Sequence, residues 1–195
     1  VTLVVVVFVG IEQGVVAAAF LGLARRVRIA ARPRDVILGR EPGTEHWVDP
    51  DVGRPTEQVP GVVVYVLYGP VWYGNATYVV QRAMRAVQAA APVDTLVLDA
   101  MAVADVDYTG AKALGEMVRD LGDQGTSVLI ARASHLVHHD LKHAGLLGAL
   151  TADKWFANVD DAVKARPQGA YQAEPARGDG GGGAEVAQPG SGGQA

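Results

Sequence analysis

The chain contains no cysteine, so disulfide bonds and cysteine-ligated metal sites are excluded. Only 6% of its 195 residues are aromatic, and its net charge of −4 gives no general support for nucleic-acid binding. The phosphate-loop pattern G-x-x-x-x-G-K-[ST] is missing. No dinucleotide fingerprint, Ser-His-Asp arrangement or pair of glycosidase-type carboxylates stands out either. The sequence therefore predicts that the protein is not an enzyme.

Residues 1–24 are almost wholly apolar, and only Glu12 and Gln13 interrupt them. About 20 apolar residues suffice to cross a bilayer as a helix. A cluster of arginines follows this run, whereas a secretory signal has its basic residues at the start. This order predicts one transmembrane helix whose C-terminal end faces the cytoplasm. The alternative is a buried helix of a soluble protein. The start on Val1 rather than methionine suggests a piece of a longer protein.

Three further segments follow this apolar run. Residues 25–57 are rich in arginine and proline and are expected to form a loop-rich connector, with a short edge strand near His46–Val48. Residues 58–165 have the composition of a globular domain. Residues 166–195 are rich in glycine, alanine and proline and bury too little to offset their ordering entropy, so we expect a disordered tail.

Within the globular segment, stretches of β-branched residues alternate with amphipathic stretches. The predicted strands are Gly61–Tyr68, Thr95–Ala100, Gly125–Arg132 and Lys154–Ala157. The predicted helices are Ala76–Ala90, Gly110–Leu121, Ser134–Ala144 and Val159–Ala165. This alternation predicts an α/β sandwich with a mostly parallel inner sheet of about four to five strands flanked by helices.

The most polar corner of the predicted domain lies between Thr95 and Leu114. A strand ends on Asp99, a loop carries Asp107, and Thr109 opens a helix. Backbone N–H groups at a helix N-terminus lack partners and favour negative charge. The segment is therefore a candidate for an anion-tolerant site.

The residues also resemble a known family. The strand Val62–Leu67, the loop Gly69–Ala76 and the sequence Asp107-Tyr108-Thr109-Gly110 resemble the STAS domain, and so do Leu141–Leu147 and Trp155-Phe156. This domain is shared by anti-sigma-factor antagonists and by the tails of SulP-type anion transporters. Two further segments resemble the last membrane helix of a SulP transporter: Ile11-Glu12-Gln13-Gly14 and Arg32-Pro33.

The resemblance implies a regulatory site and an anion site. In the antagonists an Asp-x-Ser pattern carries a phosphorylated serine, so Asp107 and Thr109 become a candidate regulatory phosphosite; the alternative is that Thr109 only caps its helix. STAS domains have also been proposed to bind nucleotides. A guanine nucleotide is the cofactor considered, and no other is expected. Its candidate site comprises Asp99, Asp107, Thr109, Gly110 and Lys112.

Two further groups of residues were considered. Trp72, Tyr73 and Asn75 form a candidate docking surface for the membrane part of the transporter; the alternative is that the aromatic rings cover the domain's own core. Asn75 is also expected to cap the following helix. The histidines at 135, 139 and 143 share one predicted helix face, but a solvated face is favoured and no metal site is predicted.

The sequence thus predicts the cytoplasmic regulatory domain of a SulP-type anion transporter in the inner (plasma) membrane, with sulfate as the substrate. Its expected partners are the membrane part of the same transporter, a second copy of it, and a kinase or other cytosolic regulator, but no nucleic acid. The alternative is a free-standing module like the anti-sigma-factor antagonists, able to bind nucleotide and switched at Thr109.

Overall fold

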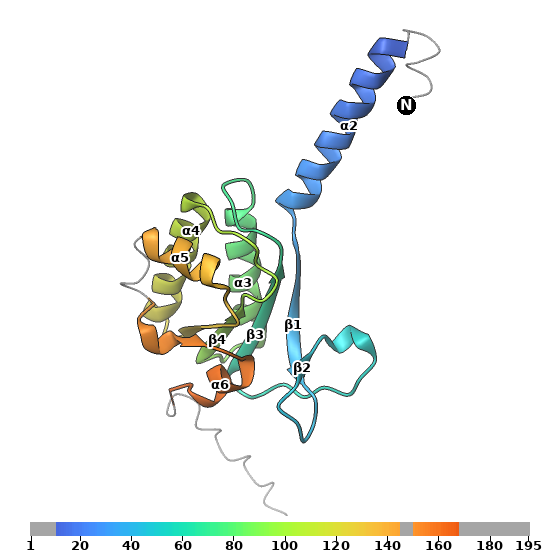
Figure 1. Cartoon of the computed structure of the whole chain (residues 1–195). Coiled ribbons are helices and arrows are strands. Elements are labelled where there is room, and N and C mark those ends of the chain that lie inside the picture. Colours follow the sequence, from blue (N-terminus) through green and yellow to red (C-terminus); the bar gives the residue numbers. More distant parts are fainter. Residues whose placement is uncertain (1–10, 145–149, 168–195) are drawn as a thin grey trace, which may run out of the picture.

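The computed structural model describes residues 11–144 and 150–167 of the chain. In this part, six strands form one sheet in the order β2-β1-β3-β4-β5-β6 (Figure 1). The strands are β1 (Arg34–Arg40), β2 (Trp47–Val48), β3 (Val62–Tyr68), β4 (Thr95–Asp99), β5 (Ser127–Ala131) and β6 (Trp155–Phe156). The helices are α2 (Ile11–Ala31), α3 (Ala76–Ala90), α4 (Tyr108–Asp123), α5 (His135–His143) and α6 (Val159–Lys164), with short 3-10 turns η1 (Pro50–Val52) and η3 (Ala152–Lys154).

The sheet confirms the predicted α/β class but differs from the prediction at one edge. Strands β3 to β6 are parallel, as expected. The prediction of four to five strands is wrong, because it omits β1, which pairs antiparallel with β3. The edge strand predicted near His46–Val48 is confirmed as β2, which pairs antiparallel with β1. Residues 34–40 lie in the predicted connector. The stretch is short and begins and ends with charged residues, but Val36 and Leu38 place their side chains on one face of the sheet and pack into its core.

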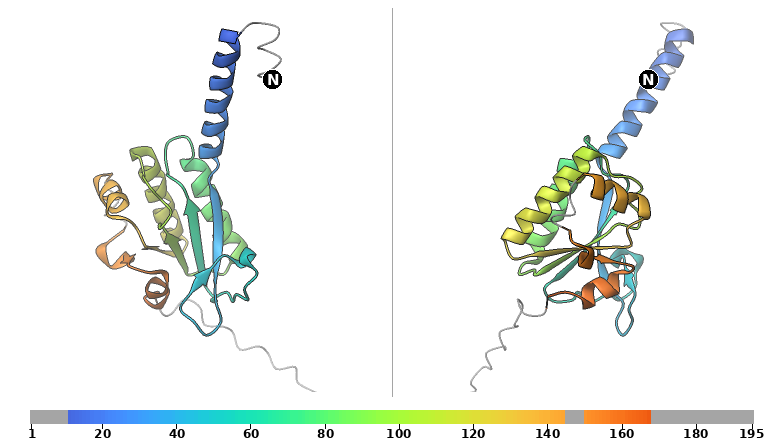
Figure 2. Two further views of the ribbon diagram at one scale, coloured as in Figure 1. Left: turned by 45° about the vertical axis from the view of Figure 1, so that its right-hand side comes forward. Right: turned by 60° about the vertical axis from the view of Figure 1, so that its left-hand side comes forward.

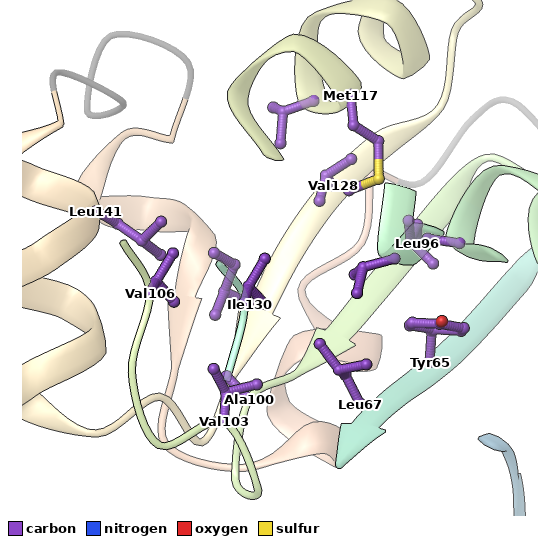
Figure 3. Close-up of a cluster of buried hydrophobic side chains, with 14 of the residues drawn as sticks. Tyr65, Leu67, Leu96, Ala100, Val103, Val106, Met117, Val128, Ile130 and Leu141 are labelled. Atoms are coloured by element: carbon purple, nitrogen blue, oxygen red, sulfur yellow. The ribbon is translucent and has the colours of Figure 1, made fainter. Parts of the chain in front are cut away.

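Both faces of the sheet are covered, which explains the near-continuous apolar strands. Alternate residues of β3 point to opposite faces, so that Val63, Tyr65 and Leu67 enter one cluster with α3, α4 and α5. The intervening valines enter a second cluster with α6. Figure 3 shows side chains of the first cluster, in which residues of the strands face Met117 of α4 and Leu141 of α5. The loops that follow the parallel strands are thereby fixed along one edge of the sheet.

Helix α2 extends away from this domain in all views (Figures 1 and 2). Its apolar side chains are largely exposed; Val16 and Phe20 each retain 69% of their surface. Among the residues that the structure describes, no helix meets the length and apolarity needed to cross a membrane. The predicted span also includes residues 1–10, and the predicted tail lies almost entirely in residues 168–195. Both segments are outside the described residues.

Candidate functional site

The loops after β3 and β4 lie side by side at the edge from which α2 departs. The backbone N–H of Val71 donates to the carbonyl of Asp105 over 3.0 Å, and the N–H of Asp107 donates to the carbonyl of Val71 over 3.0 Å. These bonds extend the pairing of the parallel strands by one bridge, between Val71 and Val106. The β3–α3 loop and the start of α4 are consequently one structural unit.

Asp107 joins the two loops through its side chain. Its Oδ1 accepts a hydrogen bond from the N–H of Gly110 over 2.6 Å, which caps α4. Its Oδ2 accepts one from the N–H of Tyr73 over 2.9 Å. The alternative in which Thr109 caps the helix is therefore wrong, because Asp107 occupies that position. Both carboxylate oxygens of Asp107 already have protein donors.

The first turn of α4 leaves Thr109 accessible. Thr109 and Lys112 are exposed. Tyr108, which directly precedes Thr109, retains 72% of its surface. Gly110, in contrast, is buried, and a Cβ built on it would lie 2.6 Å from the carbonyl oxygen of Val71. The glycine is thus required for the close approach of α4 to the β3–α3 loop.

Asp99 belongs to a different constellation from Asp107. Its side chain has no exposed surface and forms a bidentate ion pair with Arg132, while Oδ1 also accepts from the N–H of Met101. The hydrogen bond to Asp99 is the main cause that raises the pKa of the Arg132 guanidinium above its ordinary value, and burial opposes it. Arg132 has φ of 56°, which is uncommon for a residue with a Cβ. Asp99 is therefore an internal anchor, with its oxygens already engaged.

Sequence reasoning missed Arg132, although a signal for it exists. Asp99 ends β4, and Arg132 directly follows β5. Because these neighbouring strands are parallel, their carboxyl ends meet at the same edge of the sheet. Opposite charges at the ends of two adjacent parallel strands predict an ion pair.

Asn75 and Trp72 contact the end of α2. The Oδ1 of Asn75 accepts from the N–H of Trp72 over 2.9 Å, and its Nδ2 donates to the carbonyls of Pro70 (2.8 Å) and Ala30 (3.0 Å). The indole Nε1 of Trp72 also donates to Ala30, over 3.4 Å. Asn75 occupies the predicted N-cap position of α3, but its side chain makes no cap hydrogen bond. Its amide serves the loop and α2 instead.

The aromatic pair of this loop is divided between two environments. Trp72 is half-buried, whereas Tyr73 retains 73% of its surface. Their rings stack edge to face with centroids 4.8 Å apart. Trp72 thus contacts the terminal turn of α2, and Tyr73 remains available to other surfaces.

The histidines of α5 also differ in their surroundings. The rings of His139 and His143 lie 4.2 Å apart on an exposed face, while His138 stacks on Trp155. Within residues 11–144 and 150–167, no three potential metal ligands are grouped closely enough to hold an ion.

Comparison with known proteins identifies the class. Residues 54–162 match the family model of the STAS domain, and the chain belongs to this family. Its relatives are SulP sulfate transporters. It is 32% identical over 157 residues to a probable sulfate transporter of Mycobacterium tuberculosis, covering 80% of this chain and 28% of the relative. It is 27% identical over 159 residues to the probable sulfate transporter 3.5 of Arabidopsis thaliana, covering 81% of this chain and 25% of the relative.

The fold agrees with these matches. The structure of the murine solute carrier 26 family member A9 anion transporter superposes with a TM-score of 0.77 at 20% identity, covering 84% of this chain and 27% of that one. This chain spans little more than a quarter of the curated relatives' length.

Proposed function

We propose that this chain is the C-terminal part of a SulP-type transporter in the inner (plasma) membrane, that its substrate is sulfate, and that the STAS domain lies in the cytoplasm. The observation that carries the proposal is the 157-residue match to a sulfate transporter, which is longer than the STAS match alone. Helix α2 supports it, because exposed apolar residues precede the arginines. In this proposal α2 belongs to the last membrane helix of the transporter.

The proposed role of the domain is regulation of transport rather than catalysis. The two carboxylates of the candidate site are held by protein donors: Asp99 by Arg132, and Asp107 by two backbone N–H groups. Carboxylates engaged in this way position the loops instead of transferring protons. The proposed partners are the membrane part of the same transporter and a second copy of it.

The test is uptake of radiolabelled sulfate by the whole protein of which this chain is a part. We expect uptake that unlabelled sulfate competes away, and a changed rate when residues 58–165 are removed. Membrane abundance, measured by immunoblot, controls for loss of the protein. An unchanged uptake rate without the domain would contradict its regulatory role. Absence of sulfate uptake by the whole protein would contradict the assignment of sulfate as the substrate.

Phosphorylation at Thr109 is the proposed form of regulation. Its side chain is exposed in the first turn of α4, where a phosphate would lie at the positive end of the helix dipole. A cytosolic kinase would then be the partner. Intact-mass analysis of the protein from its host tests this: an unmodified Thr109 at every sulfate supply, with normal uptake by Thr109→Ala, would exclude it.

Binding of a guanine nucleotide is a second proposal for the same corner. Of its candidate residues, Thr109 and Lys112 are exposed, and the positive end of the α4 dipole lies beside them. Titration of the chain with a guanine nucleotide, followed by amide chemical shifts, provides the test. We expect shifts at Thr109–Lys112 and little change at Asp99, whose oxygens are already engaged; no shifts in residues 107–112 would rule out this site.

A further inference from the structure

The C-terminal turn of α2 ends in carbonyl groups that the helix itself cannot satisfy. The last four carbonyls of any helix lack the N–H of the residue four positions ahead. Here Pro33 cannot supply an N–H, and Arg34 already belongs to β1. The carbonyl of Ala30 instead receives two donors from the domain, Asn75 Nδ2 at 3.0 Å and Trp72 Nε1 at 3.4 Å.

Asn75 is buried in the loop, and its hydrogen bonds hold its side chain in place for this contact. It retains only 1% of its surface, and its side chain makes three hydrogen bonds, two within the loop and one to α2. Its Oδ1 accepts from Trp72, and its Nδ2 is shared between Pro70 and Ala30. An asparagine whose amide is fixed at both ends cannot rotate without losing several bonds.

The same loop is bound at its other side by Asp107. The N–H of Tyr73, directly after Trp72, donates to Asp107 Oδ2, while Asp107 Oδ1 caps α4. The contact of Trp72 with α2 and the contact of Tyr73 with the cap of α4 are therefore made by adjacent residues. The exposed Thr109 lies one residue before Gly110, whose N–H is the capped group.

We propose that Asn75, assisted by Trp72, is the positioning residue that fixes the direction in which α2 leaves the STAS domain, and that Asp107 couples this clamp to the first turn of α4. A change in charge or ligation at that turn then alters the seating of α2. This regulatory consequence rests on the proposed transport function, whereas the clamp itself is a property of this chain alone.

The absence of cysteine makes the clamp directly measurable in the 195-residue chain in detergent micelles. Spin labels are attached at Gly22→Cys on α2, where nothing lies within 4 Å of an added Cβ, and at Gln88→Cys on the exposed face of α3. Pulsed electron paramagnetic resonance then gives the distribution of distances between α2 and the domain. The unmodified clamp is expected to give one narrow distribution.

Asn75→Asp is the critical variant. It keeps an oxygen for the N–H of Trp72 but replaces the donor to Ala30 and Pro70 by a negative charge facing two carbonyls and the negative end of the α2 dipole. We expect the distribution to broaden roughly twofold, because lost donors free the hinge. Asn158→Asp, the same substitution at the exposed cap of α6, is the matched control and should leave the distribution of distances between α2 and the domain unchanged.

Asp107→Asn tests the coupling. Its amide oxygen can still cap α4 through Gly110, but its NH₂ group faces the N–H of Tyr73 and loses that bond. We expect the distance distribution to broaden here as well, but by less than in Asn75→Asp. An unchanged distribution would overturn the coupling, and an unchanged distribution in Asn75→Asp would overturn the clamp.

Two safeguards keep the result interpretable. Thermal unfolding by circular dichroism shows whether each variant is folded; if Asn75→Asp is not, Asn75→Ser, which is too short to reach Ala30, takes its place with the same expected broadening. Because these distances are measured in the 195-residue chain without a transport assay, an unchanged distribution would overturn the clamp but not the proposed function. Conversely, broadening in the chain without any change in sulfate uptake by the corresponding transporter variant would count against the regulatory role alone.

Discussion

At the scale of single residues, Gly110 determines how closely α4 approaches the β3–α3 loop. A methyl group at this position would lie 2.6 Å from a backbone oxygen of Val71, which cannot rotate away as a side chain can. We predict that Gly110→Ala lowers the free energy of unfolding by about 1–3 kcal/mol, as overpacking of a well-filled site does.

Gly122 provides the matched control in the same helix, because an added Cβ there meets nothing within 4 Å. Gly122→Ala should stabilise the protein by about 0.5–1 kcal/mol through the helix propensity of alanine. Urea denaturation measures both variants. Equal effects of the two substitutions would show that α4 is not held against Val71.

Arg132 is the second residue whose contribution can be measured. Removing it leaves the fully buried carboxylate of Asp99 without its partner. We predict that Arg132→Met lowers the free energy of unfolding by about 3–5 kcal/mol, the usual consequence of breaking a buried pair from one side.

The control for Arg132 is Arg40, whose ion pair with Glu57 is solvent-exposed. Arg40→Met should cost less than about 1 kcal/mol because water screens that pair. Denaturation at neutral pH compares the two variants. A loss as small for Arg132→Met as for Arg40→Met would mean that Asp99 finds another partner or is hydrated.

At the scale of elements, β1 connects α2 to the sheet and completes the domain. Leu38 is buried in the cluster on the α6 face, and Asp35 binds Arg82 of α3 through both carboxylate oxygens at 3.1 and 2.9 Å. This ion pair raises the pKa of Arg82. The domain as a folding unit therefore begins at Arg34, twenty residues before the family match begins.

Shortened chains test the role of β1. A chain that begins at Pro33 should unfold cooperatively, since it retains every strand of the sheet. A chain that begins at Glu41 should aggregate or unfold at a markedly lower temperature, because β3 becomes an exposed apolar edge and Leu38 is missing. Calorimetry and light scattering distinguish the two, and equal stability would show that β1 is dispensable.

At the scale of the whole molecule, the described part of the chain consists of a packed domain and a helix that extends from it (Figures 1 and 2). The side chains of Val16, Phe20 and Leu23 on this helix are exposed, which is costly in water. This arrangement favours a transporter segment over the free-standing signalling module, which would need no such helix.

Membrane fractionation separates these two functions. We predict that the 195-residue chain is recovered with membranes when expressed in bacteria, and that a chain lacking residues 1–32 is recovered in the supernatant. Alkaline washing of the membranes excludes loosely bound protein. Recovery of the full chain in the supernatant as a folded protein would favour the signalling module instead.

Several features of this protein were determined by the sequence alone. The β-branched runs predicted β3, β4 and β5 within a residue or two of their bounds, because strands covered on both faces are apolar throughout. The amphipathic stretch after Asp107 predicted a helix that opens at Thr109-Gly110, and α4 begins at Tyr108, although Asp107 rather than Thr109 caps it. These predictions succeeded because their causes lie within a few neighbouring residues.

Only the tertiary structure decided which distant groups meet. Asn75 reaches Ala30 across 45 residues, Arg132 reaches Asp99 across 33, and β1 enters the sheet although its short, charge-flanked sequence resembles a connector. A hydrogen-bonding amide or a guanidinium accepts many partners, and chain topology selects among them. The polar corner was therefore located from the sequence, whereas its connection to α2 follows from the order of the strands and the path of the chain between them.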